Sequence, residues 1–167
     1  MNQTTPAVDF KQLVADLKKI GLKNGDDVYV HSSLKSIGWI EGGPASLIDA
    51  FLEVLGTEGT LLVPTHTYCF TKRGVPPYNK HATPTVLGAF PEAVRLHSRA
   101  LRSDNGSHSS AAIGKNAEYY TASHDKAFAM GYDSPLNRLY CNHGKILLLG
   151  VTHKANTSIH LVAEQAV

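Results

Sequence analysis

Short apolar runs alternate along this chain with segments whose apolar residues follow helical spacing. The apolar runs, which we predict to be strands, are residues 27–31, 60–63, 110–113 and 145–151. The helical spacing predicts helices over residues 10–20, 44–55, 91–97, 117–123 and 135–141. Strands that alternate with helices in this way are typical of the α/β class, in which helices flank a central sheet.

The size and composition of the chain suit one globular domain. Of its 167 residues, 43% are hydrophobic and 18% are charged, so the chain can bury a core and we expect residues 1–167 to form a single domain. A net charge of +2 without a Lys/Arg run gives no reason to expect nucleic acid as a partner. No apolar run approaches the roughly 18 residues of a membrane span, and the first residues do not resemble a signal peptide. We therefore expect a cytoplasmic protein that does not bind membranes.

Polar residues follow the first two predicted strands, at the edge where ligands bind in α/β sheets. The segment His31-Ser32-Ser33-Leu34 follows the first strand. Its hydroxyls and backbone N–H groups could hold an anion such as a diphosphate, although the pattern alone favours an ordinary serine-rich turn. Thr65 and His66 follow the second strand, where a capping threonine and a surface histidine are the alternative.

A third polar segment, residues 102–110, leads into the strand predicted at 110–113. It contains Arg102, His108 and four serines. That composition suits a phosphate or another substrate, whereas a solvated turn around Asn105-Gly106 is the alternative.

The last predicted strand is followed by His160 and Glu164. If Ser158 starts a helix, these two side chains lie four residues apart on one face. A carboxylate beside an imidazole orients the ring and raises its basicity, which makes the pair a candidate general base, with a surface pair as the alternative. Although the chain has nine histidines, it lacks H-E-x-x-H and H-x-H spacing, so we expect no metal.

Five segments, in this order, resemble those of the aminoglycoside 3-N-acetyltransferases, also called antibiotic N-acetyltransferases. The segments are VHSSLKSIGWIEGGPASLIDAFLEVLGTEGTLLVPTHTY, TPTVLGAFPEAVRLHSRALRS, SHSSAAIG, GYDSPLNRLY and ILLLGVTHKANTSIHLVAE. The resemblance implies an α/β sheet flanked by helices, in a fold unrelated to that of Gcn5-type acetyltransferases. It also implies transfer of the acetyl group of acetyl-CoA to an amine of an aminoglycoside, a function tied to antibiotic resistance.

The resemblance implies roles for individual residues as well. The segment from His31 to Leu34 is similar to the one that holds the pantetheine and diphosphate of CoA. Further implied CoA contacts are Ser103, His108 and Ser109. His160 matches the histidine regarded as the general base, and Glu164 resembles its carboxylate partner. The candidates on the side of the acceptor substrate are Thr65 and His66.

The chain departs from the family pattern in four places. Asn105-Gly106 stands where the family often has His-Pro. Val162 is an insertion that places Glu164 four residues after His160 instead of three, and Tyr78-Asn79-Lys80-His81 stands where acidic residues are expected. Family members also continue well beyond the last segment, so we expect a C-terminally shortened chain whose sheet has an unpaired edge, which favours self-association. Two alternative functions follow: a CoA-binding remnant without acceptor chemistry, and an N-acyltransferase that acts on a different amine.

Overall fold

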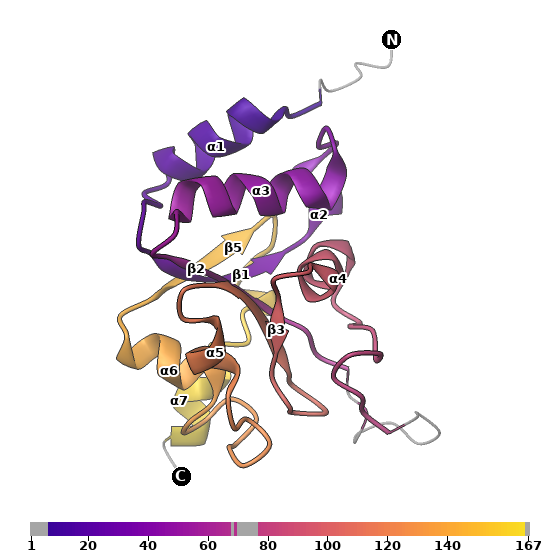
Figure 1. The fold of residues 1–167 in the computed structure, drawn as a ribbon, viewed down its shortest axis with the longest axis vertical. Helices are drawn as coiled ribbons and strands as arrows, with labels where there is room; N and C mark the ends of the chain where they lie inside the picture. Colours follow the sequence, from indigo (N-terminus) through magenta and orange to yellow (C-terminus); the bar gives the residue numbers. More distant parts are fainter. Residues whose placement is uncertain (1–6, 68, 70–76, 166–167) are drawn as a thin grey trace.

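The computed structural model describes residues 7–67, 69 and 77–165, and within these residues five strands form one mixed sheet (Figure 1). The strands are β1 Asp27–Ser32, β2 Thr60–Pro64, β3 Leu101–Arg102, β4 Ser110–Gly114 and β5 Lys145–Leu149. They lie in the order β3-β4-β2-β1-β5. β1 pairs in parallel with β2 and β5, whereas β4 runs antiparallel to both β2 and β3. The predicted α/β class is confirmed, and the short strand β3 is an addition to the predicted strands.

Helices lie on both sides of this sheet. They are α1 Phe10–Lys19, α2 Leu34–Ile37, α3 Gly43–Leu55, α4 Ala89–Leu96, α5 Ala117–Thr121, α6 Pro135–Cys141, the 3-10 helix η1 His153–Ala155 and α7 Ile159–Gln165. Figure 1 shows α1 and α3 above the sheet and α5, α6 and α7 below it. The predicted helices are confirmed to within a few residues at their ends, whereas the single turn of α2 lies in what the sequence indicated as a turn. In the part of the chain that the structure describes, no helix has the length and apolar character needed to cross a bilayer.

Local sequence signals begin and end several of these helices. The carboxylate of Asp9 accepts a hydrogen bond from the Gln12 backbone N–H at 2.8 Å at the start of α1. The Ser134 hydroxyl caps α6 in the same way, at 3.1 Å from the Asn137 nitrogen. Gly56 ends α3 with a φ of 63°, and a Cβ at this position would lie 2.0 Å from Oδ1 of Asn24. Any other residue at position 56 would therefore be strained.

The two faces of the sheet bury two apolar cores. Val28 and Val30 of β1 face α1, α3 and α4, where Phe51 and Phe90 lie with their ring centroids 5.8 Å apart. Tyr29 points to the opposite face of the sheet and joins the second core, which lies between the sheet and helices α5 and α6. This alternation buries the central strands on both sides, as parallel sheets require. The strand ends therefore stay fixed relative to one another.

β5 forms one end of the sheet within the described residues and is less buried than β1 and β2. Ile146 of β5 is 39% exposed. The unpaired edge expected from the sequence is therefore present in these residues, while self-association stays a prediction. On its paired side, β5 ends level with β1, where Leu149 lies opposite Ser32, and the carbonyl of Leu149 accepts a hydrogen bond from the Ser33 N–H at 3.0 Å. This bond fixes the start of the segment between β1 and α2.

Candidate functional site

One edge of the sheet collects the polar segments that the sequence singled out. β1, β2 and β5 end at this edge, and the antiparallel strand β4 begins there, with Ser110 beside Pro64. His31, His66 and His108 are therefore brought toward one another from distant parts of the sequence. The carboxyl ends of parallel strands are where open α/β sheets bind ligands.

A groove runs from this edge along α2 to the beginning of α4. Its three consecutive hollows have volumes of about 510, 260 and 90 Å³. The first two share Leu34, Lys35 and Ala89, and the last two share Ser32, Leu87 and Pro91. Because neighbouring hollows share walls, they lie side by side in one row, which we call the α2–α4 groove. It starts beside the exposed Trp39 and ends at His31.

The walls of the groove offer groups that can bind an anion. Lys35 lines both larger hollows, and the N-terminus of α4 opens into the groove at Gly88, where the first helical N–H groups are not used within the helix. Ser32 Oγ and His31 Nε2 are buried and have no hydrogen-bond partner in the described residues. Buried polar atoms of this kind are normally satisfied, so a ligand in the groove is their natural partner. The structure thus brings the predicted segment His31–Leu34 to a site where an anionic chain fits.

Imidazole rings gather where the groove ends. The rings of His66 and His108 lie edge to face with centroids 4.7 Å apart. Burial, together with the nearby charges of His108, His31, His124 and His160, lowers the pKa of His66 to about 3. Burial also lowers the pKa of His31 to about 4. Near neutral pH these two buried rings are therefore uncharged and can accept or donate one hydrogen bond at each nitrogen.

The pair predicted at the end of the chain lies on α7, next to this cluster. His160 is exposed to solvent, and Glu164 is half-buried four residues further along the helix. The carboxylate of Glu164 accepts a hydrogen bond from the Met130 backbone N–H at 3.1 Å. Burial lowers the pKa of His108, with the Glu164 charge raising it and the His160 charge lowering it. Both members of the pair are thus close to His108, and the role of Glu164 as the partner of His160 stays a prediction.

Three hydroxyls that the sequence assigned to ligand binding make hydrogen bonds within the protein. The Ser103 hydroxyl lies 2.8 Å from Nδ1 of His124, and both residues are fully buried. The Ser109 hydroxyl donates to the Thr65 carbonyl at 2.7 Å and lies 3.1 Å from the Thr65 hydroxyl. These bonds join the end of β2 to the start of β4. Direct contacts from Ser103 and Ser109 to CoA, or from Thr65 to an acceptor, stay predictions.

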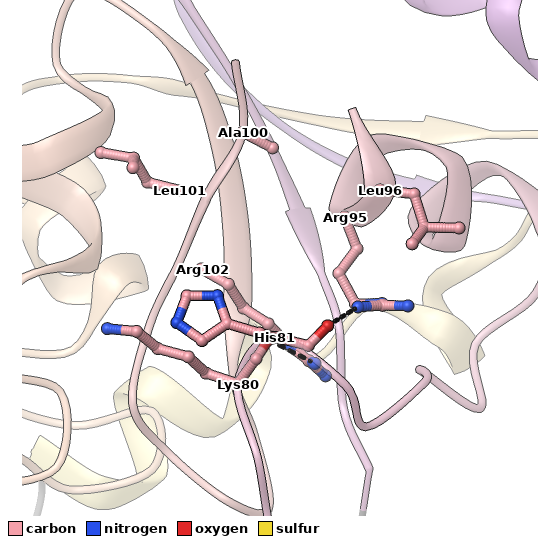
Figure 2. Close-up of a pocket in the computed structure, with 7 residues that line it drawn as sticks. All are labelled: Lys80, His81, Arg95, Leu96, Ala100, Leu101 and Arg102. Atoms are coloured by element: carbon pink, nitrogen blue, oxygen red, sulfur yellow. Dashed lines mark hydrogen bonds between the residues drawn. The ribbon is translucent and has the colours of Figure 1, made fainter. Parts of the chain in front are cut away.

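Arg102 has a structural role that the sequence pattern did not indicate. Its buried guanidinium donates to the carbonyls of Thr83, Lys80 and Thr65 at 2.5, 3.2 and 2.8 Å. Figure 2 shows Arg102 behind Lys80 and His81, in a hollow of about 250 Å³ at the C-terminal end of α4. This hollow is at the other end of α4 from the α2–α4 groove. Instead of a phosphate contact, the side chain fastens the segment around residues 80–83 to the end of β2.

Replacing Arg102 with methionine should lower the free energy of unfolding by about 3 kcal/mol, because one buried and two half-buried carbonyl oxygens lose their donor. Urea unfolding followed by circular dichroism measures the change. The matched control is Lys115→Met, which removes a cation from an exposed pair with Glu58 and should have little effect. Equal, small effects of both substitutions would contradict the role given to Arg102.

A second hollow, of about 480 Å³, lies beyond the histidines. Its walls are Thr67, Cys69, Pro77, Asn79, Ala82, Thr83, Pro84 and Val86. The segment that separates it from the groove is attached to β2, because the His66 carbonyl accepts hydrogen bonds from the Val86 N–H and the Thr85 hydroxyl at 3.0 and 2.9 Å. We call it the acceptor-side hollow. Its described walls are apolar or neutral and contain no carboxylate.

The described residues contain no group of three or more His, Cys, Asp or Glu side chains arranged to hold a metal ion.

Comparisons with known proteins agree with the geometry. A family model described as aminoglycoside 3-N-acetyltransferase matches residues 29–167. The chain is 33% identical over 171 residues to the SPbeta prophage-derived aminoglycoside N(3')-acetyltransferase-like protein YokD of Bacillus subtilis, covering 90% of this chain and 63% of that protein. A structure of AAC-IIIb in a binary complex with CoASH matches with a TM-score of 0.85 at 30% identity, covering 93% of this chain and 64% of that one.

The structure of AAC-VIa bound to sisomicin matches with a TM-score of 0.84 at 28% identity, again covering 93% of this chain and 64% of that one. The chain thus spans somewhat less than two thirds of the length of these relatives. The family model nevertheless matches well over half of the chain, and the predicted fold agrees with those of the solved relatives. The chain therefore belongs to the aminoglycoside 3-N-acetyltransferase family.

Proposed function

We propose that this chain binds acetyl-CoA in the α2–α4 groove and transfers the acetyl group to an amine of an aminoglycoside, with His160 as the general base. The observation that carries the proposal is the row of adjoining hollows in the groove, which extends from Trp39 to His31 beside the histidine cluster. The CoASH complex of AAC-IIIb and the sisomicin complex of AAC-VIa support the two substrates, because both enzymes share this fold.

The groove residues fit the parts of acetyl-CoA. Lys35 and the N-terminus of α4 at Gly88 offer positive charge to the diphosphate. Ser32 Oγ and His31 Nε2, which have no partner in the described residues, are available to the amide groups of the pantetheine arm. The apolar hollow beside Trp39 suits the adenine ring. The thioester then lies toward the histidine cluster.

The chemistry in this proposal needs one proton acceptor. Acetyl-CoA supplies an acetyl group on a thioester, which an uncharged amine can attack. Aminoglycoside amines are largely protonated at neutral pH, so one proton is first lost to solvent to give the uncharged amine. His160 then takes a second proton from the nitrogen as the N–C bond to the acetyl carbon forms. The C–S bond breaks, and the proton passes to the departing sulfur to give the CoA thiol. A positioned base of this kind typically contributes about 10²–10⁴-fold to the rate.

An assay of thiol release with acetyl-CoA and a panel of aminoglycosides tests the activity. We expect CoA release that depends on the aminoglycoside and produces one equivalent of N-acetylated product. If folded protein binds CoA without turnover, the chain is a CoA-binding remnant and the proposed transfer is wrong. If it neither binds nor turns over, both parts of the proposal fail.

Replacing Ala89 with phenylalanine should weaken acetyl-CoA binding by at least about 10-fold, because Ala89 is exposed and lines both larger hollows of the groove. Calorimetric titration with acetyl-CoA measures the affinity, and the melting temperature should stay within a few degrees. The control is Ala15→Phe, the same change on the exposed side of α1, which should leave the affinity unchanged. Full affinity in the Ala89 variant would place the coenzyme elsewhere.

A second candidate activity, N-acyl transfer to a different amine, is favoured by the acceptor-side hollow. A polycationic aminoglycoside is best oriented by acidic walls, and the described walls of this hollow carry no carboxylate. The same assay with simple and apolar primary amines distinguishes the two activities. Thioester cleavage with these amines alone would select the second candidate and exclude aminoglycosides as acceptors.

We also propose that the chain works in the cytoplasm. Its two cysteines, Cys69 and Cys141, are both free thiols in the structure. Free thiols persist in a reducing compartment and are commonly oxidised outside it.

A further inference from the structure

The loop between α5 and α6 holds the carboxylate that is expected to assist His160. The Met130 backbone N–H of this loop donates to Oε2 of Glu164 at 3.1 Å. The Met130 side chain is 4% exposed and packs in the core below the sheet, so the donor cannot move freely. The next residue is Gly131, where a Cβ would lie 3.0 Å from the same carboxylate oxygen. Loop and helix α7 are therefore in close contact at Glu164.

A buried imidazole, that of His124, holds this loop in turn. Nε2 of His124 lies 3.0 Å from the Ala129 carbonyl oxygen. A carbonyl oxygen can only accept, so Nε2 carries the hydrogen. Burial lowers the pKa of His124 to about 4, which leaves Nδ1 free of a proton at neutral pH. Nδ1 therefore accepts from the Ser103 hydroxyl at 2.8 Å, and the Ser103 oxygen accepts from the Ser110 N–H at 2.9 Å.

These contacts form one chain of hydrogen bonds from the sheet to α7. Ser110 is in β4, Ser103 directly follows β3, His124 and Ala129 belong to the loop, and the next N–H reaches Glu164. Ser103 and His124 are fully buried, so water does not compete for these bonds. The arrangement can transmit the rigidity of the sheet to a side chain on a short helix at the end of the described chain.

We infer that His124 is a positioning residue, which fixes the backbone of Ala129 and Met130 and thereby holds the Glu164 carboxylate in place beside the His160 site. The catalytic consequence rests on the proposed acetyl transfer, whereas the positioning itself does not. His124 is too deeply buried to meet a substrate and acts through Glu164. Ser103 then has a role besides the predicted ligand binding, because the hydroxyl of Ser103 selects the tautomer of His124.

His108 offers a readout of this positioning that does not depend on catalysis. Its pKa is lowered chiefly by burial, is raised by the Glu164 charge and is lowered by the His160 charge, and its ring also contacts that of His66. A carboxylate that leaves its place would therefore lower the pKa of His108. NMR titration of the histidine ring protons reports this change in the folded protein.

The test compares two substitutions of His124 that differ in one hydrogen bond. Asparagine can approximate Nδ1 of the imidazole but loses the donor to Ala129, whereas glutamine can approximate Nε2 and keep that donor. We expect His124→Asn to lower the pKa of His108, as Glu164→Gln should, and His124→Gln to restore most of the native value. The double variant His124→Asn/Glu164→Gln should show no further shift, because both changes remove the same interaction.

An unchanged His108 titration in a folded His124→Asn variant would overturn the inference, as would equal effects of asparagine and glutamine. If His124→Asn does not fold, Gly131→Ala decides. It leaves His124 intact and crowds the carboxylate directly, so it should lower the pKa of His108, and an unchanged value would show that the loop does not place Glu164.

If acetyl transfer is detected, the kinetics of the same variants give a second test. We expect His124→Asn to lower kcat by at least about 10-fold while the KM for acetyl-CoA stays within about twofold. The loss should be non-additive with that of Glu164→Gln. If His124 had a purely structural role, His124→Asn would instead lower the melting temperature without a selective loss of kcat at an unchanged KM. Without detectable turnover, the NMR titration alone tests the positioning, so failure of the proposed function and failure of this inference are distinguishable.

Discussion

Replacement of His160 with alanine should lower the rate of acetyl transfer by at least about 100-fold and leave the affinity for acetyl-CoA nearly unchanged. The reason is geometric. His160 is exposed on α7 and is not among the residues that line the α2–α4 groove, but it is close enough to His66 and His108 for its charge to lower the pKa of both. Its loss therefore removes a proton acceptor without removing a wall of the coenzyme site.

Steady-state kinetics and calorimetric titration of the same preparation measure the two quantities. His97→Ala is the matched control, because His97 lies at the C-terminal end of α4 and outside the groove. It should leave both turnover and affinity at their native values. If His160→Ala retains native turnover, His160 is not the base, and if it loses acetyl-CoA affinity instead, its role is in binding.

Lowering the pH from 6.5 to 5 should lower the free energy of unfolding by about 4 kcal/mol. Burial holds the pKa of His31 at about 4, that of His66 at about 3 and that of His124 at about 4, whereas an unfolded histidine titrates near 6.5. Between these values the unfolded chain binds protons that the native chain does not. Stability is therefore complete above pH 6.5 and falls as the pH decreases toward 4, by up to about 1.4 kcal/mol per pH unit for each histidine.

Urea unfolding at several values between pH 7.5 and 5 measures this dependence. The hydrogen-bonded Arg95 side chain lowers the pKa of Glu92. The stability that this ion pair contributes is lost only as the pH falls below the ordinary range of a carboxyl. Glu92 therefore does not affect the change in stability between pH 6.5 and 5. His124→Gln removes one titrating ring and should reduce the slope by about a third. A free energy of unfolding that is the same at pH 6.5 and 5 would contradict the burial of neutral histidines.

Much of the fold follows from local sequence signals. The caps at Asp9 and Ser134 and the glycine at position 56 act within a few residues, so they can be recognised without knowing the fold. The strands β1, β2 and β5 are equally visible as short apolar runs. That His31 and His66 meet is then a consequence of parallel pairing, since parallel strands end at one edge.

The remaining features depend on contacts between distant residues and have no local signal. Arg102 resembles a phosphate ligand in the sequence, but its guanidinium binds carbonyls that only the folded chain brings together. The Ser103 hydroxyl in the same way forms a hydrogen bond with His124, a contact that no local pattern indicates. The partner of Glu164 is a backbone N–H, which any residue except proline would supply at position 130, so no sequence pattern could identify it.

A crystal structure of the chain with CoA tests the central proposal most directly. We predict that the coenzyme lies in the α2–α4 groove, with its diphosphate at Lys35 and Gly88. Its sulfur should be within reach of the His160 ring, at about 3–5 Å, either directly or through one water. A coenzyme bound outside the groove, or a thiol far from His160, would contradict the proposal that this chain transfers an acetyl group with His160 as the base.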